Sequence, residues 1–190
     1  MPGKSTADLI LEHRVLLERR REFPQGMLAA YIDLKKEFDS VHQKTLWDLL
    51  RLRGIPARII DLLTGLYSGT VSAVKHGVGV SSFFPVNTGV RHGCVLAPSL
   101  FNTCMDWVLG RVEQSHCGAS VGNIKITDLV FADDAAIFAE SLEVLVMALE
   151  ALHEEVRPLG LNVSWAKTKV QVFGGVLDET VQSVHACGEN

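Results

Sequence analysis

Three aspartates at the ends of apolar segments are the strongest chemical signal in this sequence of 190 residues. Asp133 and Asp134 interrupt an apolar stretch between residues 126 and 139, which predicts a β-hairpin with both carboxylates at its turn. Asp33 follows another apolar stretch, residues 27–32. Carboxylates at neighbouring strand ends could hold two divalent cations about 3.5–4 Å apart and support an in-line phosphoryl displacement. The alternative is that Asp simply favours turns.

Three further segments could contact a nucleotide. Phe38 lies five residues after Asp33. An aromatic ring there could pack beneath a sugar and exclude a 2′-hydroxyl by its bulk; the alternative is a core residue. Residues 87–98 are rich in glycine and precede a predicted helix, so backbone and Arg91 could approach a phosphate. Lys167 or Lys169 could protonate a departing pyrophosphate, although both could also belong to an ordinary solvated loop.

Composition limits the class of protein. A chain of this length with 47% hydrophobic residues can bury the core of one domain. A net charge of −4 argues against a uniformly basic nucleic-acid binder, although residues 1–60 carry 11 basic and 8 acidic side chains. The cysteines lack zinc-ligand spacing, and we find neither a signal peptide nor an apolar run of about 20 residues. These features predict a soluble intracellular protein, nuclear or cytoplasmic.

Hydrophobic periodicity predicts a mixture of helices and strands. The predicted helices span residues 5–21, 44–53, 57–67, 98–114 and about 15 residues from 142. The predicted strands are residues 27–32, 71–74 and 78–80, the Asp-Asp hairpin, and residues 169–173. Because hairpins outnumber β-α-β crossovers, we expect an α+β fold, a mostly antiparallel sheet with helices packed on one face.

Taken in order, these motifs resemble the reverse transcriptase domain of non-LTR (LINE-type) retrotransposons. The matching segments are residues 2–8, 33–41, 88–102, 131–134 and 160–169. The resemblance implies the palm of a right-hand polymerase that performs RNA-directed DNA synthesis on an RNA template, a DNA primer and a dNTP. Asp33, Asp133 and Asp134 would hold two Mg²⁺ ions, with Mn²⁺ as a possible substitute, and Asp33 and Asp133 are favoured as direct ligands.

The same resemblance implies a nucleotide site. The backbone from Leu34 to Phe38 would lie near the triphosphate, and Phe38 would be the steric gate against ribonucleotides. Lys167 would lie near the leaving pyrophosphate. Arg91, His92 and Gly93 fall in the template- and nucleotide-binding motif, where His92 replaces the glutamine that the family usually has.

The resemblance also divides the chain, giving residues 1–175 as the palm with partial fingers and residues 176–190 as an incomplete tail. Fingers strands would precede Pro2, and a primer grip and thumb would follow Val176, so we expect this polypeptide alone to be a weak or inactive polymerase. The main alternative is a transposon-derived fragment that serves as a binding or interaction module. An unrelated cyclase-like or metal-phosphatase α+β domain shares the two-metal chemistry but does not explain the order of the motifs.

Overall fold

The computed structural model describes residues 6–22, 26–115, 117–121, 124–131 and 134–174. Its helices are α1 (Thr6–Glu22), α2 (Glu37–Ser40), α3 (Gln43–Leu52), α4 (Ala57–Tyr67), α5 (Ala97–Val112) and α6 (Leu142–Val156). Short 3-10 turns extend α5 (Glu113–Ser115) and α6 (Arg157–Leu159). Its strands are β1 (Met27–Ile32), β2 (Val71–Ser72), β3 (Lys75–His76), β4 (Gly79–Val80), β5 (Phe84–Pro85), β6 (Ala119–Val121), β7 (Ile124–Ile126), β8 (Asp128–Phe131), β9 (Asp134–Ala139) and β10 (Lys169–Phe173).

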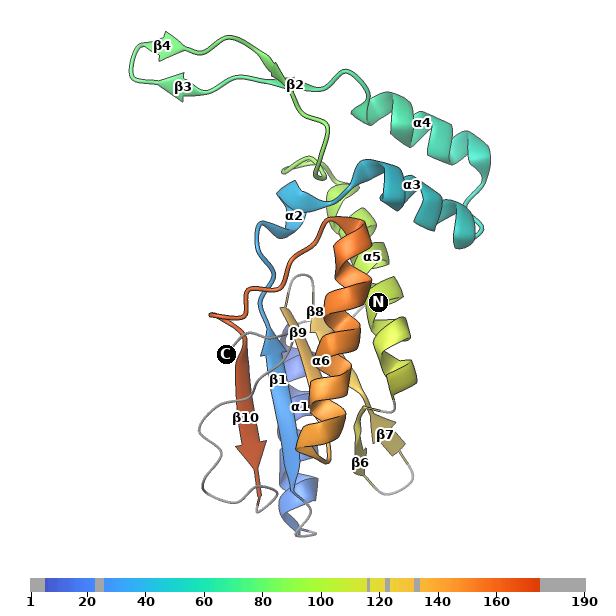
Figure 1. Ribbon diagram of the computed structural model, residues 1–190, viewed down its shortest axis with the longest axis vertical. Helices are drawn as coiled ribbons and strands as arrows, with labels where there is room; N and C mark the ends of the chain where they lie inside the picture. Colours follow the sequence, from blue (N-terminus) through green and yellow to red (C-terminus); the bar gives the residue numbers. More distant parts are fainter. Residues whose placement is uncertain (1–5, 23–25, 116, 122–123, 132–133, 175–190) are drawn as a thin grey trace.

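The central sheet is antiparallel and has the strand order β10-β1-β9-β8 (Figure 1). Its inner strand pair, β1 and β9, sets Ile32 opposite Ala135. The hairpin of β8 and β9 pairs Phe131 with Asp134. The predicted hairpin is therefore confirmed, but Asp134 begins β9 instead of lying in the turn, because it pairs with Phe131. Residues 132 and 133 lie outside the described residues.

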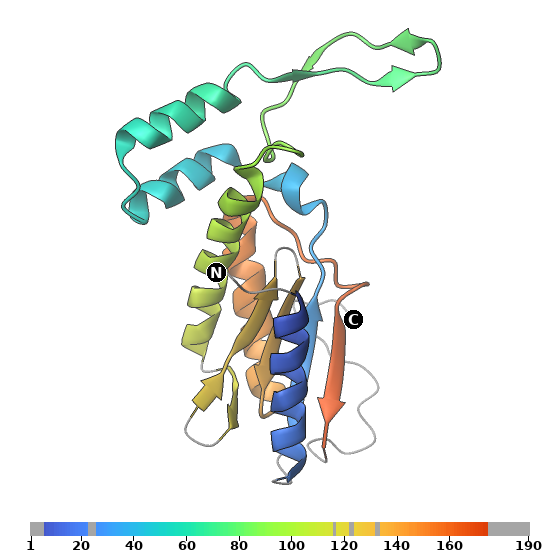
Figure 2. The same ribbon diagram turned by 180° about the vertical axis from the view of Figure 1, so that it is seen from behind.

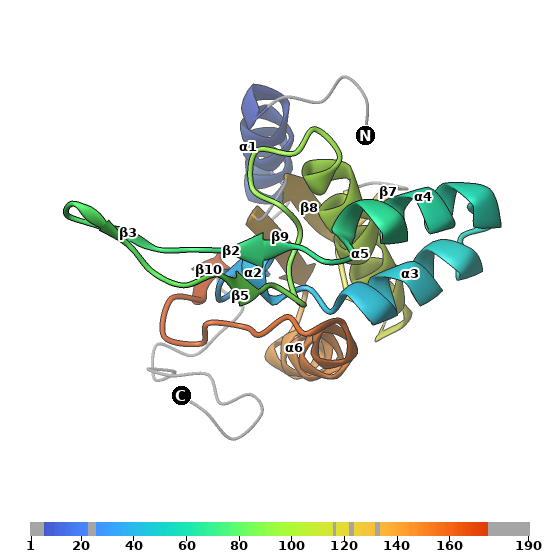
Figure 3. The ribbon, with the colours of Figure 1, turned by 90° about the horizontal axis from the view of Figure 1, so that it is seen from above.

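The sheet is covered on both faces. Helices α5 and α6 pack on one face with Leu28, Ala30 and Ile32 of β1 in a large core, as predicted. Helix α1 lies across the other face, against Met27 and Ala29, and in the view from behind it stands in front of the sheet (Figures 2 and 3). The prediction placed helices on one face of the sheet, whereas α1 covers the other face. The uninterrupted apolar sequence of β1 explains the second layer, since both faces of this strand need cover.

A separate layer of helices and strands stands above the end of the sheet where β1 leads into α2 (Figure 1). Helices α3 and α4 pack against each other, and α3 also contacts α5. The chain then extends into a two-stranded arm, residues 71–85, in which β2 pairs with β5 and β3 pairs with β4. The sequence predicted two short strands here, residues 71–74 and 78–80. In the structure, the arm has four two-residue strands that form two antiparallel pairs.

The hairpin of β6 and β7 was not predicted. The sequence around residues 126–131 reads as one apolar run, but the structure breaks it at Thr127, between β7 and β8. The Thr127 hydroxyl lies 2.7 Å from an Asp128 carboxylate oxygen and 3.0 Å from Glu113 Oε1. No helix within the described ranges is long and apolar enough to cross a membrane.

Candidate active site

Asp33 lies at the end of the sheet where β1 stops and β9 begins. Ile32 is opposite Ala135 in the ladder, so continuing the antiparallel register brings the backbone of Asp33 to the level of Asp134. Phe131, the last residue of β8, pairs with Asp134 at this same end of the sheet. The fold therefore brings the backbones of Asp33 and Asp134 to one end of the sheet. Asp133 and the side chain of Asp134 lie outside the described part of the structure.

The Asp33 carboxylate is held close to a lysine. Its Oδ1 atom is 3.5 Å from Lys167 Nζ, and this buried oxygen accepts no hydrogen bond from the residues that the structure describes. The Asp33 amide lies 3.4 Å from the Thr168 hydroxyl, and its carbonyl accepts a 2.8 Å hydrogen bond from the Ser164 amide. The backbone is thus fixed while a carboxylate oxygen keeps open acceptor capacity.

The loop that carries Lys167 runs along the segment after Asp33. Leu34 forms an antiparallel bridge with Val163, and the Lys35 amide donates to the Asn162 carbonyl over 2.8 Å. The Leu34 side chain is buried, so only its backbone could make the predicted contact with a triphosphate. The Lys35 amide could not, because it already donates to Asn162. Segments more than a hundred residues apart in sequence therefore form one wall of the site.

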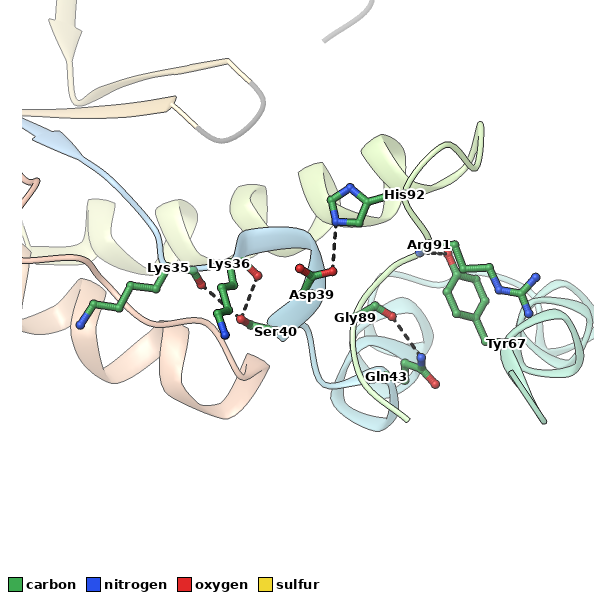
Figure 4. A network of polar contacts seen from close by, with 9 residues as sticks. All are labelled: Lys35, Lys36, Asp39, Ser40, Gln43, Tyr67, Gly89, Arg91 and His92. Carbon is green, nitrogen blue, oxygen red and sulfur yellow. Dashed lines mark hydrogen bonds and ion pairs between the residues drawn. The ribbon is translucent and has the colours of Figure 1, made fainter. Parts of the chain in front are cut away.

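The Gly-rich loop contacts the same segment from the other side (Figure 4). Gly89 has a φ of +82°, and a Cβ there would lie 2.8 Å from the Phe38 carbonyl oxygen and 2.9 Å from the Asp39 backbone. The Val90 amide donates to the Phe38 carbonyl over 2.6 Å, and Gln43 donates to the Gly89 carbonyl over 3.0 Å. Only glycine permits this approach and backbone conformation.

Phe38 contacts two other rings. It stacks on the buried Phe101 of α5, with centroids 4.9 Å apart and planes 22° apart. The His92 ring is 5.5 Å from the Phe38 ring, tilted by 44°. His92 Nε2 is also 3.0 Å from Asp39 Oδ1, the contact drawn in Figure 4. Phe38 is therefore half-buried at the edge of the core, which suits both a core role and an exposed wall.

Arg91 is directed to α4. Its Nη2 atom donates to the Leu66 carbonyl and to the Thr70 hydroxyl, each over 2.6 Å, and its guanidinium lies 5.4 Å from the centre of the Tyr67 ring. These contacts fasten the Gly-rich loop to the base of the arm. Gly93 has a φ of +79° in the turn that precedes α5. A phosphate contact for Arg91 stays a prediction.

The site residues predicted from the sequence thus form two neighbouring groups, one at each end of the segment formed by residues 33–38. Asp33 and Lys167 contact each other at its start, and Phe38 and His92 contact each other at its end. Sequence reasoning did not single out Thr168, and only its position between two lysines of the predicted motif could have indicated a role. Nothing in the sequence pointed to the pairing of Tyr67 with Arg91.

Divalent cations prefer carboxylate oxygens, and Asp33 offers one that accepts no hydrogen bond from the described residues. Within the part of the chain that the structure describes, no group of three His, Cys, Asp or Glu side chains is arranged to hold a metal ion. Asp133 and the side chain of Asp134 lie outside that part. The binding of two metals therefore stays a prediction.

Comparison with known protein families gives a match over nearly the whole chain. The family model described as "Reverse transcriptase (RNA-dependent DNA polymerase)" matches residues 1–188. The chain is 32% identical over 161 residues to the Retrovirus-related Pol polyprotein from type-1 retrotransposable element R2 of Nasonia vitripennis. It is 34% identical over 157 residues to the corresponding type-2 R2DM polyprotein of Drosophila melanogaster. These matches cover 83% of this chain but only 16% and 14% of the two polyproteins.

Solved structures show the same fold at low sequence identity. A Candida albicans telomerase in complex with a TWJ fragment of telomeric RNA superposes with a TM-score of 0.70 and 13% identity, over 94% of this chain and 31% of that one. A C-terminally truncated apo telomerase from Candida tropicalis gives a TM-score of 0.67 and 18% identity, over 93% of this chain and 36% of that one. The architecture is therefore that of a right-hand polymerase.

Proposed function

The chain belongs to the reverse transcriptase (RNA-dependent DNA polymerase) family, and we propose that it is the polymerase core of a retrotransposon polyprotein that copies RNA into DNA. The observation that carries this proposal is the register of β1 against β9, which brings the backbone of Asp33 to the level of Asp134, the first residue of β9. We assign residues 1–175 to the palm with part of the fingers. The RNA-dependent DNA polymerase family supports RNA as the template, and we propose a DNA primer and a dNTP as the other substrates.

Asp33, Asp133 and Asp134 would hold divalent cations, Mg²⁺ or Mn²⁺. The fit rests on Asp33, whose Oδ1 atom accepts no hydrogen bond from the described part of the chain and so keeps lone pairs for a cation. When bound, such cations supply charge neutralisation at the triphosphate and an activated primer 3′-hydroxyl. Thr168 and Ser164 fix the backbone that carries this carboxylate, which keeps its direction constant during the reaction.

In the reaction, the primer 3′-hydroxyl loses its proton to solvent and its oxygen forms a bond to the α-phosphorus of the dNTP. The bond from that phosphorus to the leaving pyrophosphate breaks. Lys167 holds its ammonium group 3.5 Å from Asp33 Oδ1, beside the place where negative charge develops. Its side chain is 71% exposed, so it can turn to a pyrophosphate oxygen and donate a proton there.

The nucleotide itself would lie along the segment from Leu34 to Phe38. The exposed lysines Lys35 and Lys36 extend from this segment away from the Asp39–His92 contact and supply positive charge (Figure 4). Phe38 would form the wall beneath the sugar that excludes a 2′-hydroxyl. Arg91, His92 and Gly93 would border the base and template side of this site.

A single-nucleotide addition assay tests the proposal. The purified chain, in excess over poly(rA)/oligo(dT) at low salt, should add dTTP in the presence of Mg²⁺, since single turnovers do not require a processive grip. Asp33→Asn should lower this addition about a hundredfold or more, because it removes a charge needed in the transition state. Asp48→Asn, an exposed aspartate on α3, is the matched control and should leave the rate unchanged.

A second readout is independent of turnover. Mg²⁺ or Mn²⁺ should raise the melting temperature of the chain by mass action, and Asp33→Asn should weaken this response while Asp48→Asn should not. Nucleotide addition that survives Asp33→Asn would contradict the proposed site. Tight binding of RNA and primer without any addition, in the original chain and in Asp33→Asn alike, would instead support a binding module.

A further inference from the structure

The side chain of Phe38 contacts a residue from a loop far along the sequence. Phe101, which is fully buried, stacks on the Phe38 ring with centroids 4.9 Å apart. The His92 ring lies 5.5 Å from the Phe38 ring, tilted by 44°, and is largely exposed. Phe101 is fixed by the surrounding core, so the exposed His92 is the neighbour whose position can change and, with it, that of the Phe38 ring.

His92 is itself held by the residue next to Phe38. Its Nε2 atom lies 3.0 Å from Asp39 Oδ1, and Asp39 directly follows Phe38 in α2. The backbone beneath is fixed as well, because the Val90 amide donates to the Phe38 carbonyl and Gly89 packs against the Asp39 backbone. Ring and backbone of Phe38 are therefore both tied to one loop, residues 89–92.

We propose that His92 and Asp39 form a positioning pair that holds Phe38 in place and thereby sets discrimination between deoxyribonucleotides and ribonucleotides. The inference rests on the proposed polymerase function and on Phe38 as the wall beneath the sugar. In this arrangement His92 acts through Phe38, since its Nε2 atom is engaged by Asp39. Loss of either partner lets the ring move outward, and the wall then admits a 2′-hydroxyl.

The pair suits such a role because it contributes little to folding. The side chains of His92 and Asp39 are 69% and 66% exposed, and ion pairs of this exposure stabilise proteins only weakly. Variants at either position should therefore fold normally. An effect on nucleotide choice can then be separated from an effect on stability.

The test compares dTTP and UTP addition on poly(rA)/oligo(dT) for the chain and its variants. His92→Ala and Asp39→Ala should each lower the ratio of kcat/KM for dTTP over UTP by about three- to tenfold, because UTP addition becomes more efficient relative to dTTP addition. Asp39→Asn keeps an acceptor oxygen for His92 and should retain most of the discrimination. The double alanine variant should lose no more than either single variant, because the residues act as one unit.

His76→Ala, an exposed histidine on the arm, is the matched control and should leave the ratio unchanged. Hydrogen exchange of the Val90 amide, which donates to Phe38, gives a readout without catalysis and should become faster in His92→Ala and Asp39→Ala. An unchanged ratio in an active enzyme would overturn the inference, as would unchanged exchange at Val90. Absence of all nucleotide addition would count against the proposed function, and the exchange result would still decide whether the pair holds this segment.

Discussion

Two carboxylates have pKa values that their surroundings shift in opposite directions. Burial raises the pKa of Asp128 on β8, and the hydrogen bond with the Thr127 hydroxyl opposes this rise only in part. At Glu140, after β9, hydrogen bonds lower the pKa: the Ser120 amide donates over 2.9 Å and the guanidinium of Arg20 donates over 3.0 Å. Folding thus makes the charged form of Asp128 less favourable and the charged form of Glu140 more favourable.

These opposite shifts predict opposite pH dependences. A raised folded-state pKa gives stability at low pH that is lost as pH rises through that pKa, so Asp128→Asn should stabilise the protein at neutral pH. A lowered folded-state pKa gives stability that is lost on acidification, so Glu140→Gln should destabilise it at neutral pH. Denaturant unfolding at a series of pH values measures both differences.

Both differences should shrink as pH falls into the ordinary range of carboxyl titration, where the unfolded chain also becomes protonated. The two variants serve as controls for each other because each replaces a carboxylate by an isosteric amide. Changes of the same sign at neutral pH would contradict the assignment of burial to Asp128 and of hydrogen bonding to Glu140.

At the scale of elements, the arm of residues 71–85 differs from the rest of the described chain. Its apolar side chains are exposed rather than packed, including Val74 at 58%, Val78 at 111% and Phe83 at 73%. Its hydrogen bonds between Val74 and Ser81 stay within the arm. An element that buries so little surface depends on the body for its position but adds little to the free energy of folding.

Shortening the arm should therefore leave the fold intact. Replacing residues 73–83 by Asn-Gly keeps the pairing of Ser72 with Phe84 and closes it with a turn suited to a two-residue hairpin. We expect the free energy of unfolding to change by less than about 1 kcal/mol. Chemical denaturation checks this value, and light scattering should show less self-association because exposed apolar residues are removed.

Loss of cooperative unfolding in the shortened variant would show that the arm is part of the core. A loop of the same length with Val74, Val78 and Phe83 replaced by serine is the control, since it keeps the chain length and removes only the apolar surface. It should match the shortened variant in scattering.

At the scale of the whole molecule, the sheet separates buried clusters of unequal size. The cluster under α5 and α6 includes Leu152 and draws on most elements of the fold. The cluster under α1 contains Leu16 and Phe138 and is much smaller. Arg20, which is 5% exposed and paired with Glu140, closes the edge of this smaller cluster. The two faces should therefore differ in local stability.

Equal truncations on the two faces test this difference. Leu152→Ala should lower the global free energy of unfolding by about 2–5 kcal/mol, because it leaves a cavity in the shared core. Leu16→Ala should chiefly allow α1 to open locally, since fewer elements meet there. Hydrogen exchange by element distinguishes the outcomes: α1 amides should exchange faster in Leu16→Ala while α6 amides keep their protection. Uniformly faster exchange in Leu16→Ala would show that α1 belongs to one cooperative unit with the rest.

Much of the fold follows from local sequence patterns. The bounds predicted for α4, α6 and β10 agree with the structure because their apolar periodicity and the Gly or Pro residues at their ends are local signals. The same holds for the hairpin with Asp134 and for Asp33 at a strand end. Motif order along the chain then sufficed to predict a polymerase fold, because each motif carries its residue types at fixed spacing.

Tertiary structure alone decided which side chains meet. Sequence periodicity marks a face as apolar but does not say what covers it, so the place of α1 on the second face became apparent only in the fold. Likewise, the direction of Arg91 toward α4 and the contact of His92 with Asp39 join residues 25 and 53 positions apart. Such contacts depend on how distant segments pack around Phe38, and no local propensity encodes that packing.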